Sequence, residues 1–245
     1  METFIRFIDI WKAFGPKRIY DGLNLDIVRG ETITIIGGSG TGKSVLLKLL
    51  IGLLTPNRGK IFFDGREVTG SRESDLRAVR QRIAMLFQSA ALFDSLSVGD
   101  NVAYPILERD PKVARGELKV RVAEKLALVD LAGSEQLKPA ELSGGMRKRV
   151  GLARALAMEP DVILYDEPTT GLDPINTMRV NQLIVALNEK LHVTSIVVTH
   201  DMESAYYVSD RIAMLAHRQI VAVGTVREIR ESTNPDVQRF IRGGA

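Results

Sequence analysis

The chain of 245 residues contains no cysteine, and tryptophan occurs only once. The missing thiols exclude disulfide bonds and thiolate metal sites, which suits a reducing compartment. Long apolar runs are also absent, because the longest, at residues 45–54, is interrupted by Lys48 and is far too short to cross a bilayer. Glu2 and Arg6 come too early for the apolar core of a signal peptide. Any role at a membrane is therefore expected to depend on a partner protein.

The excess of basic over acidic residues is small, with a formal net charge of +3. Such a balance allows contact with phosphates or a membrane face, but it is not the signature of a nucleic-acid-binding domain. The basic segment Arg147-Lys148-Arg149 and the arginines at 72, 77, 80 and 82 have no aromatic platform beside them for base stacking. We therefore expect solvated helix faces there, and no nucleic-acid partner.

Strand and helix patterns alternate along most of the chain. β-type runs occur at 4–8, 23–28, 32–36, 60–63 and 83–87, and helical patterns at 46–54 and 71–81. A helix-rich segment follows at about 90–158, including a helix at 113–129. Beyond it we expect strands at 162–165, 194–198, 212–215 and 220–223, with helices at 175–191 and 202–208. This alternation predicts an α/β fold with a mainly parallel sheet, in one unit with an inserted helical subdomain.

A glycine-rich segment follows the third predicted strand and opens the apolar helix. It consists of Gly37, Gly38, Ser39, Gly40, Thr41, Gly42, Lys43 and Ser44. The spacing fits the pattern G-x-x-x-x-G-K-[ST] in the strand–turn–helix context that supports it. Backbone N–H groups of such a loop point at phosphate oxygens, Lys43 supplies charge to the β- and γ-phosphates, and the Ser44 hydroxyl can ligate Mg²⁺. The segment predicts binding of a nucleoside triphosphate.

Two adjacent acids end the predicted strand at 162–165. Asp166 is expected to hold the water shell of Mg²⁺. Glu167 is expected to point to the other face of the strand and to act as base for a water in line with the γ-phosphate. The alternative, that one acid merely caps a helix after Pro168, is weaker because the phosphate loop lies upstream. The pair favours hydrolysis over simple binding.

A second helix start carries Ser143, Gly144 and Gly145, which offer a hydroxyl, free N–H groups and a positive dipole end. One chain thus has two helix starts suited to anions, although a single nucleotide does not obviously need both. With two copies head to tail, each nucleotide would lie between the phosphate loop of one copy and the Ser-Gly-Gly of the other. The pattern predicts a symmetric homodimer with two shared sites.

In combination these motifs resemble the ATPases of the ABC-transporter family, over nearly the whole chain. In order, the family's motifs are Walker A at 37–44, the Q-loop glutamine Gln88, the signature at 142–145, the Walker B acids Asp166 and Glu167, the D-loop at 171–174 and the switch histidine His200. The resemblance implies the ABC-ATPase form of the P-loop NTPase fold, with an N-terminal antiparallel β part. It implies a single nucleotide-binding domain at 1–245, with a RecA-like core at about 1–89 and 159–245 and the helical subdomain at 90–158. ATP and Mg²⁺ would be its cofactors.

The same resemblance implies roles for further residues. Gln88 would contact Mg²⁺ and the attacking water, and would relay the nucleotide state to a permease. His200 would hold the geometry of the γ-phosphate and Glu167, and Asp173 would communicate across the dimer.

An aromatic residue is also implied at the adenine base. Phe14 lies where the family places an aromatic that stacks on adenine, a contact that needs only a flat π face. Trp11 and Tyr20 compete with it for that role, and the simpler interpretation of any one of these aromatics is core packing.

Softer motifs point to one branch of the family. After Gln88, the chain has Phe93-Asp94-Ser95 where many importers have a proline-histidine pair. With 141–146 and 166–175, this stretch resembles the Mla/MCE-type phospholipid-transport ATPases. That resemblance implies a peripheral protein at the cytoplasmic face of the bacterial inner membrane. Its partners would be an MlaE-like permease, an MCE-domain protein of the MlaD kind and, in some systems, a small STAS-domain regulator.

Two other interpretations stay open. One is an importer ATPase for amino acids, sugars or metals. The other is a non-transport ABC ATPase acting on ribosomes or DNA, which usually has two such domains or a long coiled coil, and this chain has neither.

Overall fold

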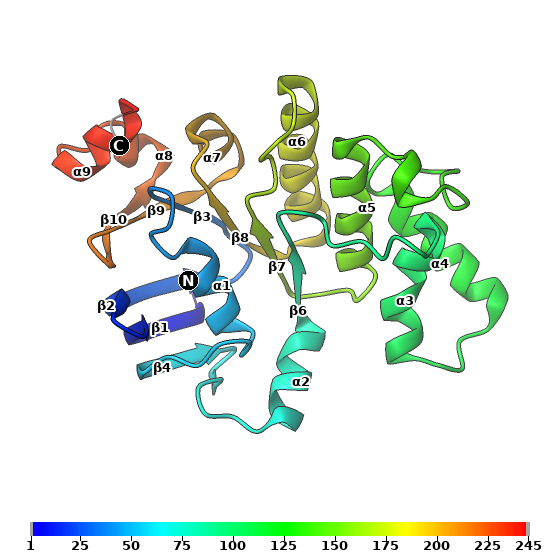
Figure 1. Cartoon of the computed structure of the whole chain (residues 1–245), viewed down its shortest axis with the longest axis horizontal. Helices are drawn as coiled ribbons and strands as arrows, with labels where there is room; N and C mark the ends of the chain where they lie inside the picture. Colours follow the sequence, from blue (N-terminus) through cyan, green and yellow to red (C-terminus); the bar gives the residue numbers. More distant parts are fainter. Residues whose placement is uncertain (1, 244–245) are drawn as a thin grey trace.

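The computed structural model describes residues 2–243, whose strands form two sheets (Figure 1). The first sheet is antiparallel, in the order β2-β1-β4-β5. The second has the order β10-β9-β3-β8-β7-β6 and is parallel except for β10. The strands are β1 (Thr3–Phe14), β2 (Lys17–Val28), β3 (Thr32–Ile36), β4 (Arg58–Phe63), β5 (Arg66–Glu67), β6 (Ile83–Leu86), β7 (Val162–Asp166), β8 (Thr194–Thr199), β9 (Arg211–Ala216) and β10 (Gln219–Thr225). The predicted α/β class with a mainly parallel sheet is confirmed.

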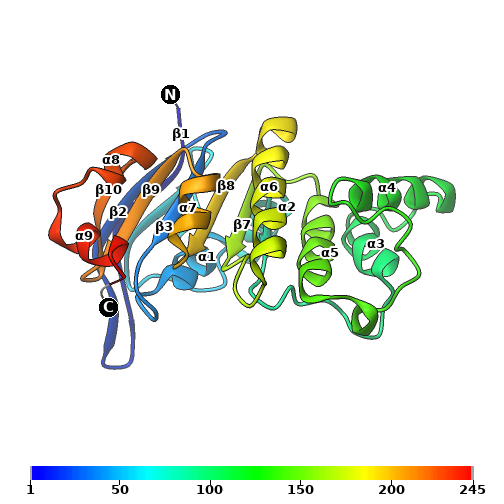
Figure 2. The same ribbon diagram turned by 90° about the horizontal axis from the view of Figure 1, so that it is seen from above.

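Nine α-helices and one short 3₁₀ helix occur within residues 2–243. They are α1 (Lys43–Leu50), α2 (Glu73–Arg82), α3 (Val98–Arg109), α4 (Arg115–Ala127), η1 (Pro139–Glu141), α5 (Gly144–Leu156), α6 (Pro174–Leu191), α7 (Met202–Val208), α8 (Val226–Arg230) and α9 (Pro235–Ile241). Figure 2 shows α3, α4 and α5 grouped at one end of the molecule, with α8 and α9 at the other. None of the helices within residues 2–243 combines the length and the apolar character that a bilayer crossing needs.

The parallel strands separate two apolar cores. In β7, Val162 and Leu164 pack with the antiparallel sheet and α1. Ile163 and Tyr165 pack instead with α3 to α6. Because side chains alternate across a strand, a strand covered on both faces is apolar throughout. Because β3, β7 and β8 run parallel, their carboxyl ends meet at one edge of the sheet, where ligands bind in sheets of this kind.

The first hairpin is longer than the sequence pattern predicted. The predictions stopped at residue 8 and resumed at residue 23, whereas β1 runs on to Phe14 and β2 begins at Lys17. Asp9 has a φ of 48°, and the ladder between the two strands shifts register beside it. Such an irregularity breaks the two-residue alternation that would have revealed the strand. The extension places Phe14 at the tip of the hairpin.

The apolar run at 46–54 is only partly helical, which corrects the predicted helix. α1 ends at Leu50, and Gly52 follows with a φ of 66°. A Cβ atom on Gly52 would lie 2.6 Å from a methyl group of Leu76 in α2. The chain therefore turns at a position that favours glycine. Beyond it, Leu54 packs against the core without continuing the helix, whereas Leu53 is 53% exposed.

Ion pairs tie the two sheets together. Arg82, the last residue of α2, contacts Asp161 through Nε at 2.5 Å, just before β7. Through a second nitrogen it contacts Asp64, after β4, at 2.7 Å, and Arg29 contacts the same carboxylate at 2.5 Å. The hydrogen bond from Arg82 holds the pKa of Asp64 below its ordinary value. A chain of alternating charges thus joins the antiparallel sheet to β7.

Candidate functional site

Residues that follow β3, β7 and β8 line a cavity of about 790 Å³. Ten residues singled out from the sequence share this lining: Phe14, Gly38, Ser39, Gly40, Gly42, Lys43, Ser44, Gln88, Glu167 and His200. The size is that of a pocket for a nucleotide-sized ligand. The segments come from widely separated parts of the chain, so the fold, and not the local sequence, assembles the cavity.

The loop between β3 and α1 passes close to its neighbours, which requires glycine at two positions. A Cβ atom on Gly37 would lie 2.4 Å from the backbone oxygen of Leu215, and one on Gly42 would lie 2.5 Å from Ile19. Gly42 also has a φ of 111°. The hydroxyl of Tyr20 donates to the Gly42 carbonyl oxygen at 2.6 Å and supports the loop from inside the core.

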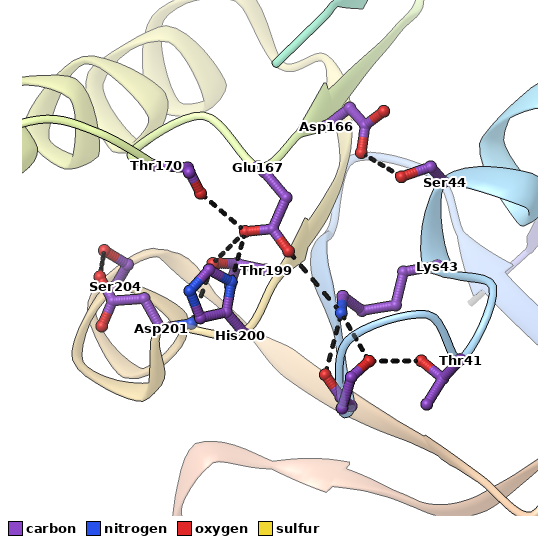
Figure 3. A network of polar contacts seen from close by, with 12 residues as sticks. Thr41, Lys43, Ser44, Asp166, Glu167, Thr170, Thr199, His200, Asp201 and Ser204 are labelled. Atoms are coloured by element: carbon purple, nitrogen blue, oxygen red, sulfur yellow. Dashed lines mark hydrogen bonds and ion pairs between the residues drawn. The ribbon is translucent and has the colours of Figure 1, made fainter.

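Lys43 places a largely buried positive charge at the cavity wall. Its ammonium donates to the carbonyl oxygens of Gly37 at 2.9 Å and Gly38 at 3.2 Å. It lies 3.7 Å from Glu167 Oε1 (Figure 3). Burial lowers the pKa of Lys43, and the carboxylates of Glu167 and Asp166 oppose that shift. The loop carbonyl of Gly38 also accepts from the Thr41 hydroxyl at 2.9 Å, so Thr41 stabilises the loop.

Ser44 and Asp166 meet although they are far apart in the sequence. The Ser44 hydroxyl donates to Asp166 Oδ1 at 2.6 Å, and Asp166 is buried at the end of β7. Residues 2–243 contain no group of three or more histidines, cysteines or acids that could hold a metal by themselves. A divalent ion at this position would have the oxygens of Ser44 and Asp166, and Gln88, phosphate and water oxygens would complete its shell. That donor set suits Mg²⁺, which usually keeps several waters.

Glu167 turns away from Asp166 and faces other partners (Figure 3). It follows β7 with a φ of 50°, in the left-handed region. Its Oε2 lies 2.9 Å from His200 Nδ1 and accepts from Thr170 at 3.1 Å and from Thr199 at 3.4 Å. The carboxylate is therefore fixed between the ammonium of Lys43 and the end of β8.

Of the three candidate aromatic residues, Phe14 lines the cavity. Its side chain is 44% exposed, and the Lys12 ammonium lies 4.9 Å from its ring centroid. Tyr20 is only 1% exposed. Trp11 donates through Nε1 to Asp9 at 2.8 Å. Phe14 is thus a partly exposed ring in the cavity lining, with Lys12 over it, whereas Tyr20 belongs to the core.

Several cavity residues were missed by the sequence analysis. They are Lys17, Ile19, Val45, Phe240 and Gly243. Phe240 comes from α9, 40 residues beyond His200, the last of the predicted motifs. No local pattern distinguishes it from an aromatic residue in an ordinary amphipathic tail.

The signature segment and the D-loop lie outside this lining. Ser143 is the N-cap of α5, and its hydroxyl accepts from the Met146 N–H at 3.2 Å. Asp173 is the N-cap of α6 and accepts from two backbone N–H groups, each at 3.0 Å. The hydrogen bonds from Asn176 lower the pKa of Asp173.

The two segments also touch each other. A Cβ atom on Gly145 would lie 2.6 Å from the side-chain oxygen of Asn176, and one on Gly144 would lie 3.5 Å from Leu172. Ser143, Gly144 and Asp173 therefore form a second exposed surface, with Gly145 buried next to it, separate from the cavity of the same chain.

The basic segment at 147–149 is mostly buried, so the prediction of a solvated helix face was wrong there. We expected a solvated helix face, but only Arg147 is exposed. Lys148 is 6% exposed and Arg149 is 9% exposed. Arg149 donates to the carbonyl oxygens of Val129 at 3.1 Å and Asp130 at 3.0 Å. These two side chains serve as buried donors to loop carbonyls, a role that charge patterning alone does not reveal.

A phosphate loop that ends beside paired acids is the arrangement of a nucleoside-triphosphate hydrolase. Comparison with known proteins agrees: the family model described as "ABC transporter" matches residues 20–170. The chain therefore belongs to the ABC transporter family, whose cassettes bind and hydrolyse ATP.

Named relatives cover nearly the whole chain. Over 243 residues it is 44% identical to the probable ribonucleotide transport ATP-binding protein mkl of Mycobacterium leprae, covering 99% of this chain and 70% of that protein. It is 44% identical over 229 residues to the intermembrane phospholipid transport system ATP-binding protein MlaF of Haemophilus influenzae, covering 94% and 86%. The MlaF protein of Escherichia coli K12 is 42% identical over 235 residues, covering 96% and 87%.

Solved structures show the same fold. A dimeric ATP-binding cassette in a post-hydrolysis state with ADP and Pi bound has a TM-score of 0.83 and 31% identity, covering 91% of this chain and 99% of that one. The protein cbiO1 of Clostridium perfringens, part of the ABC transporter complex cbiONQ, has a TM-score of 0.86 and 28% identity, covering 98% and 96%. The predicted ABC-ATPase fold is confirmed.

Proposed function

We propose that this chain is the ATPase subunit of a system that transports phospholipid between bacterial membranes. The observation that carries the proposal is the 42–44% identity to MlaF proteins over 94–96% of this chain. The mkl relatives carry ribonucleotide transport in their names at 44% identity. The present chain corresponds to 86–87% of the MlaF proteins but to 70% of the M. leprae mkl protein, which favours the MlaF comparison.

The proposed complex contains two copies of the chain at the cytoplasmic face of the inner membrane. They would bind an MlaE-like permease, which would associate with an MCE-domain protein, and a small STAS-domain protein would regulate some such systems. An exposed aromatic pair supports a partner at 89–105, because Phe93 is 43% and Tyr104 is 44% exposed, with ring centroids 5.0 Å apart. The division into a RecA-like core at about 1–89 and 159–245 and a helical subdomain at 90–158 belongs to the same proposal.

Binding would begin at the phosphate loop. Its backbone N–H groups and Lys43 would bind the β- and γ-phosphates, and Phe14 would stack on the adenine. Ser44 and Asp166 would hold Mg²⁺, with Gln88 reaching it from the loop after β6, and this ion would neutralise phosphate charge as the γ-phosphoryl group is transferred.

Hydrolysis would use Glu167 as the base. The carboxylate would accept a proton from a water whose oxygen attacks the γ-phosphorus, while the bond to the bridging β–γ oxygen breaks. His200 and Thr170 orient the carboxylate through the contacts at 2.9 Å and 3.1 Å. Gln88 would position the same water. These roles require the cavity to be closed on its open side.

A second copy would supply that closing surface. Ser143, Gly144 and Gly145 lie outside the cavity of their own chain, so they would reach a nucleotide only in a partner copy, with Asp173 beside them. A dimeric arrangement of related cassettes supports this proposal. Each ATP would then be shared by two chains.

The test is purification of the tagged chain from native membranes in mild detergent, with identification of co-purifying proteins and lipids by mass spectrometry. We expect an MCE-domain protein, a multi-spanning permease and phospholipid, together with Mg²⁺-dependent ATPase activity. A solute-binding protein in place of the MCE-domain protein would support an importer for small solutes. Recovery of ribosomes or DNA without a permease would favour a non-transport ATPase. Either result would overturn the phospholipid proposal.

A further inference from the structure

One face of α5 packs against the loop that follows β6. Lys148, Gly151 and Arg154 are spaced by three residues, so they share a face of the helix. Arg154 donates to the carbonyl oxygens of Ala90 at 3.1 Å and Ala91 at 2.8 Å. A Cβ atom on Gly151 would lie 3.2 Å from Ala90. The loop therefore rests directly on the helix.

The loop that packs against α5 has an unfavourable backbone conformation. Ala90 and Ala91 have φ values of 61° and 48°, in the left-handed region. Such a conformation is unfavourable for a residue other than glycine, so surrounding contacts must hold it. The donors of α5 supply those contacts.

Lys148 connects this loop to the hydrolytic centre. Its ammonium donates to the carbonyl oxygen of Gln88, through a short contact, and to that of Glu167 at 3.3 Å. The Glu167 carbonyl also accepts from the Thr170 N–H at 3.3 Å. Glu167 itself has a left-handed φ of 50°. One side chain thus holds the backbone of two residues that face the cavity from different strands.

The buried position of Lys148 indicates a specific role. A lysine that is 6% exposed gives up most of its hydration, and burial lowers its pKa while Asp166 and Glu167 oppose the shift. Buried charges persist where hydrogen bonds and opposite charges compensate for lost water. Here the carbonyl oxygens of Gln88 and Glu167 and the carboxylates of Asp166 and Glu167 compensate for the lost hydration. The charge of Lys148 is therefore stabilised by groups of the hydrolytic centre.

We propose that Lys148 is a positioning residue for ATP hydrolysis. Its side chain holds the Gln88 loop and the Glu167 backbone in fixed positions relative to each other and to α5. The inference rests on the proposed ATPase function of the cavity. Through Lys148, the position of the loop can affect the position of the base Glu167. When the loop moves relative to α5, the Gln88 carbonyl that Lys148 binds moves with it, and the Glu167 backbone follows through the same ammonium. No contact between the side chains of Gln88 and Glu167 is needed.

The test compares Lys148→Met, Lys148→Gln and the exposed neighbour Arg147→Met as matched control. Methionine keeps the volume but no donor, so we expect kcat to fall about tenfold or more, because small errors in placement cost that much, while ATP affinity changes by less than about threefold. Glutamine keeps an amide donor on a side chain one atom shorter. It should lose about threefold in kcat, since it reaches one carbonyl better than two. Arg147→Met should match wild type.

The outcomes separate the two proposals. Activity is expressed per folded molecule, from thermal unfolding and ATP binding of each variant, so a purely structural role would leave kcat unchanged. Wild-type kcat in Lys148→Met or Lys148→Gln would overturn the positioning role, and so would a loss of ATP affinity in proportion to the loss of kcat. The glutamine variant decides the question even when the methionine variant does not fold. A wild-type chain without ATPase activity would instead contradict the proposed function.

Discussion

Glu167 Oε2 lies 2.9 Å from His200 Nδ1, although 33 residues separate the two in the sequence. Glu167 follows β7 and His200 follows β8, and these strands are neighbours in the parallel sheet. The sheet therefore aligns a carboxylate with an imidazole at adjacent strand ends. Thr170 and Thr199 donate to the same carboxylate oxygen, so its orientation is set from three sides.

Replacing Glu167 by glutamine tests its role as base. The amide has nearly the same shape but cannot accept the proton of the attacking water, so we expect ATPase activity to fall by roughly 10²–10⁴-fold. ATP binding should persist, and the variant should accumulate as an ATP-dependent dimer in size-exclusion chromatography with light scattering. Glu189→Gln, an exposed change in α6, is the matched control. Wild-type turnover in Glu167→Gln would show that another group acts as base.

Replacing Ser143 by arginine tests the shared site. The added bulk and charge would face the phosphates bound by a partner copy, and we expect hydrolysis to be lost while ATP still binds to the phosphate loop. In a mixed dimer with Lys43→Ala, one site combines both defects and the other combines neither. Differently tagged chains purified in tandem should therefore have one working site. Unimpaired turnover of the Ser143→Arg homodimer would rule out sharing.

The buried ammonium of Lys43 predicts a pH dependence of ATP binding. Because burial lowers its pKa, the unliganded protein loses this proton at a lower pH than ordinary lysine does. Phosphate favours the protonated form, so above that pH binding must take up a proton and affinity must fall as pH rises. Calorimetry in buffers of different ionisation enthalpy measures the uptake. Lys17→Ala, at an exposed lysine of the same cavity, should leave the uptake unchanged.

Removing the ring of Phe14 tests base stacking. We expect Phe14→Ala to weaken ATP binding by about two- to twelvefold, the equivalent of about 0.5–1.5 kcal/mol. GTP should be affected similarly, because stacking needs only a flat ring. Phe14→Trp should retain the affinity. Fluorescence titration with labelled ATP provides the measurement, and unchanged affinity in Phe14→Ala would assign the base to another residue such as Phe240.

Two buried tyrosines form a matched pair for stability. The Tyr20 hydroxyl donates to Gly42 at 2.6 Å, whereas within residues 2–243 the Tyr165 hydroxyl, which faces Ser195, forms no hydrogen bond of ordinary geometry. Tyr20→Phe should therefore lower the free energy of unfolding by about 1 kcal/mol or somewhat more. Tyr165→Phe should be neutral or stabilising, because it removes an unpaired buried polar group. Urea unfolding of both variants checks the order, which would be reversed if Tyr165 were the better-bonded hydroxyl.

The sequence revealed the parts of the site whose chemistry is local. Lys43 and Ser44 sit in a glycine pattern that few other structures use, and Asp166 and Glu167 end an apolar strand, so adjacent residues carry the information. The contact of Ser44 with Asp166 follows once β3 and β7 run parallel on either side of β8, because their carboxyl ends then lie at the same edge of the sheet. The fold class was equally accessible, because alternating apolar strands and helices leave few other arrangements.

Other features depend on packing between distant segments. Nothing in three consecutive basic residues distinguishes Arg147, which is exposed, from Lys148, which lies under the loop after β6. The length of the first hairpin was hidden by the register shift at Asp9. Phe240 reaches the cavity because α9 packs against β9 and β10 at the end of the second sheet (Figure 2). The positions of Lys148 and Phe240 are set by tertiary contacts, and a single sequence carries no local signal for them.

The ion pairs of Arg82 with Asp64 and Asp161 have a consequence for nucleotide selection. They join the sheet that bears the Phe14 hairpin to the sheet that bears the phosphate loop. The two sheets therefore hold the Phe14 ring and the Lys43 ammonium at a set distance from each other. ADP would still meet both ends, because Lys43 is expected to bind the β-phosphate as well as the γ-phosphate, but only a triphosphate would also place a phosphate beside Glu167, which lies 3.7 Å from Lys43. The presence of the third phosphate, more than the identity of the base, would then be what this molecule distinguishes.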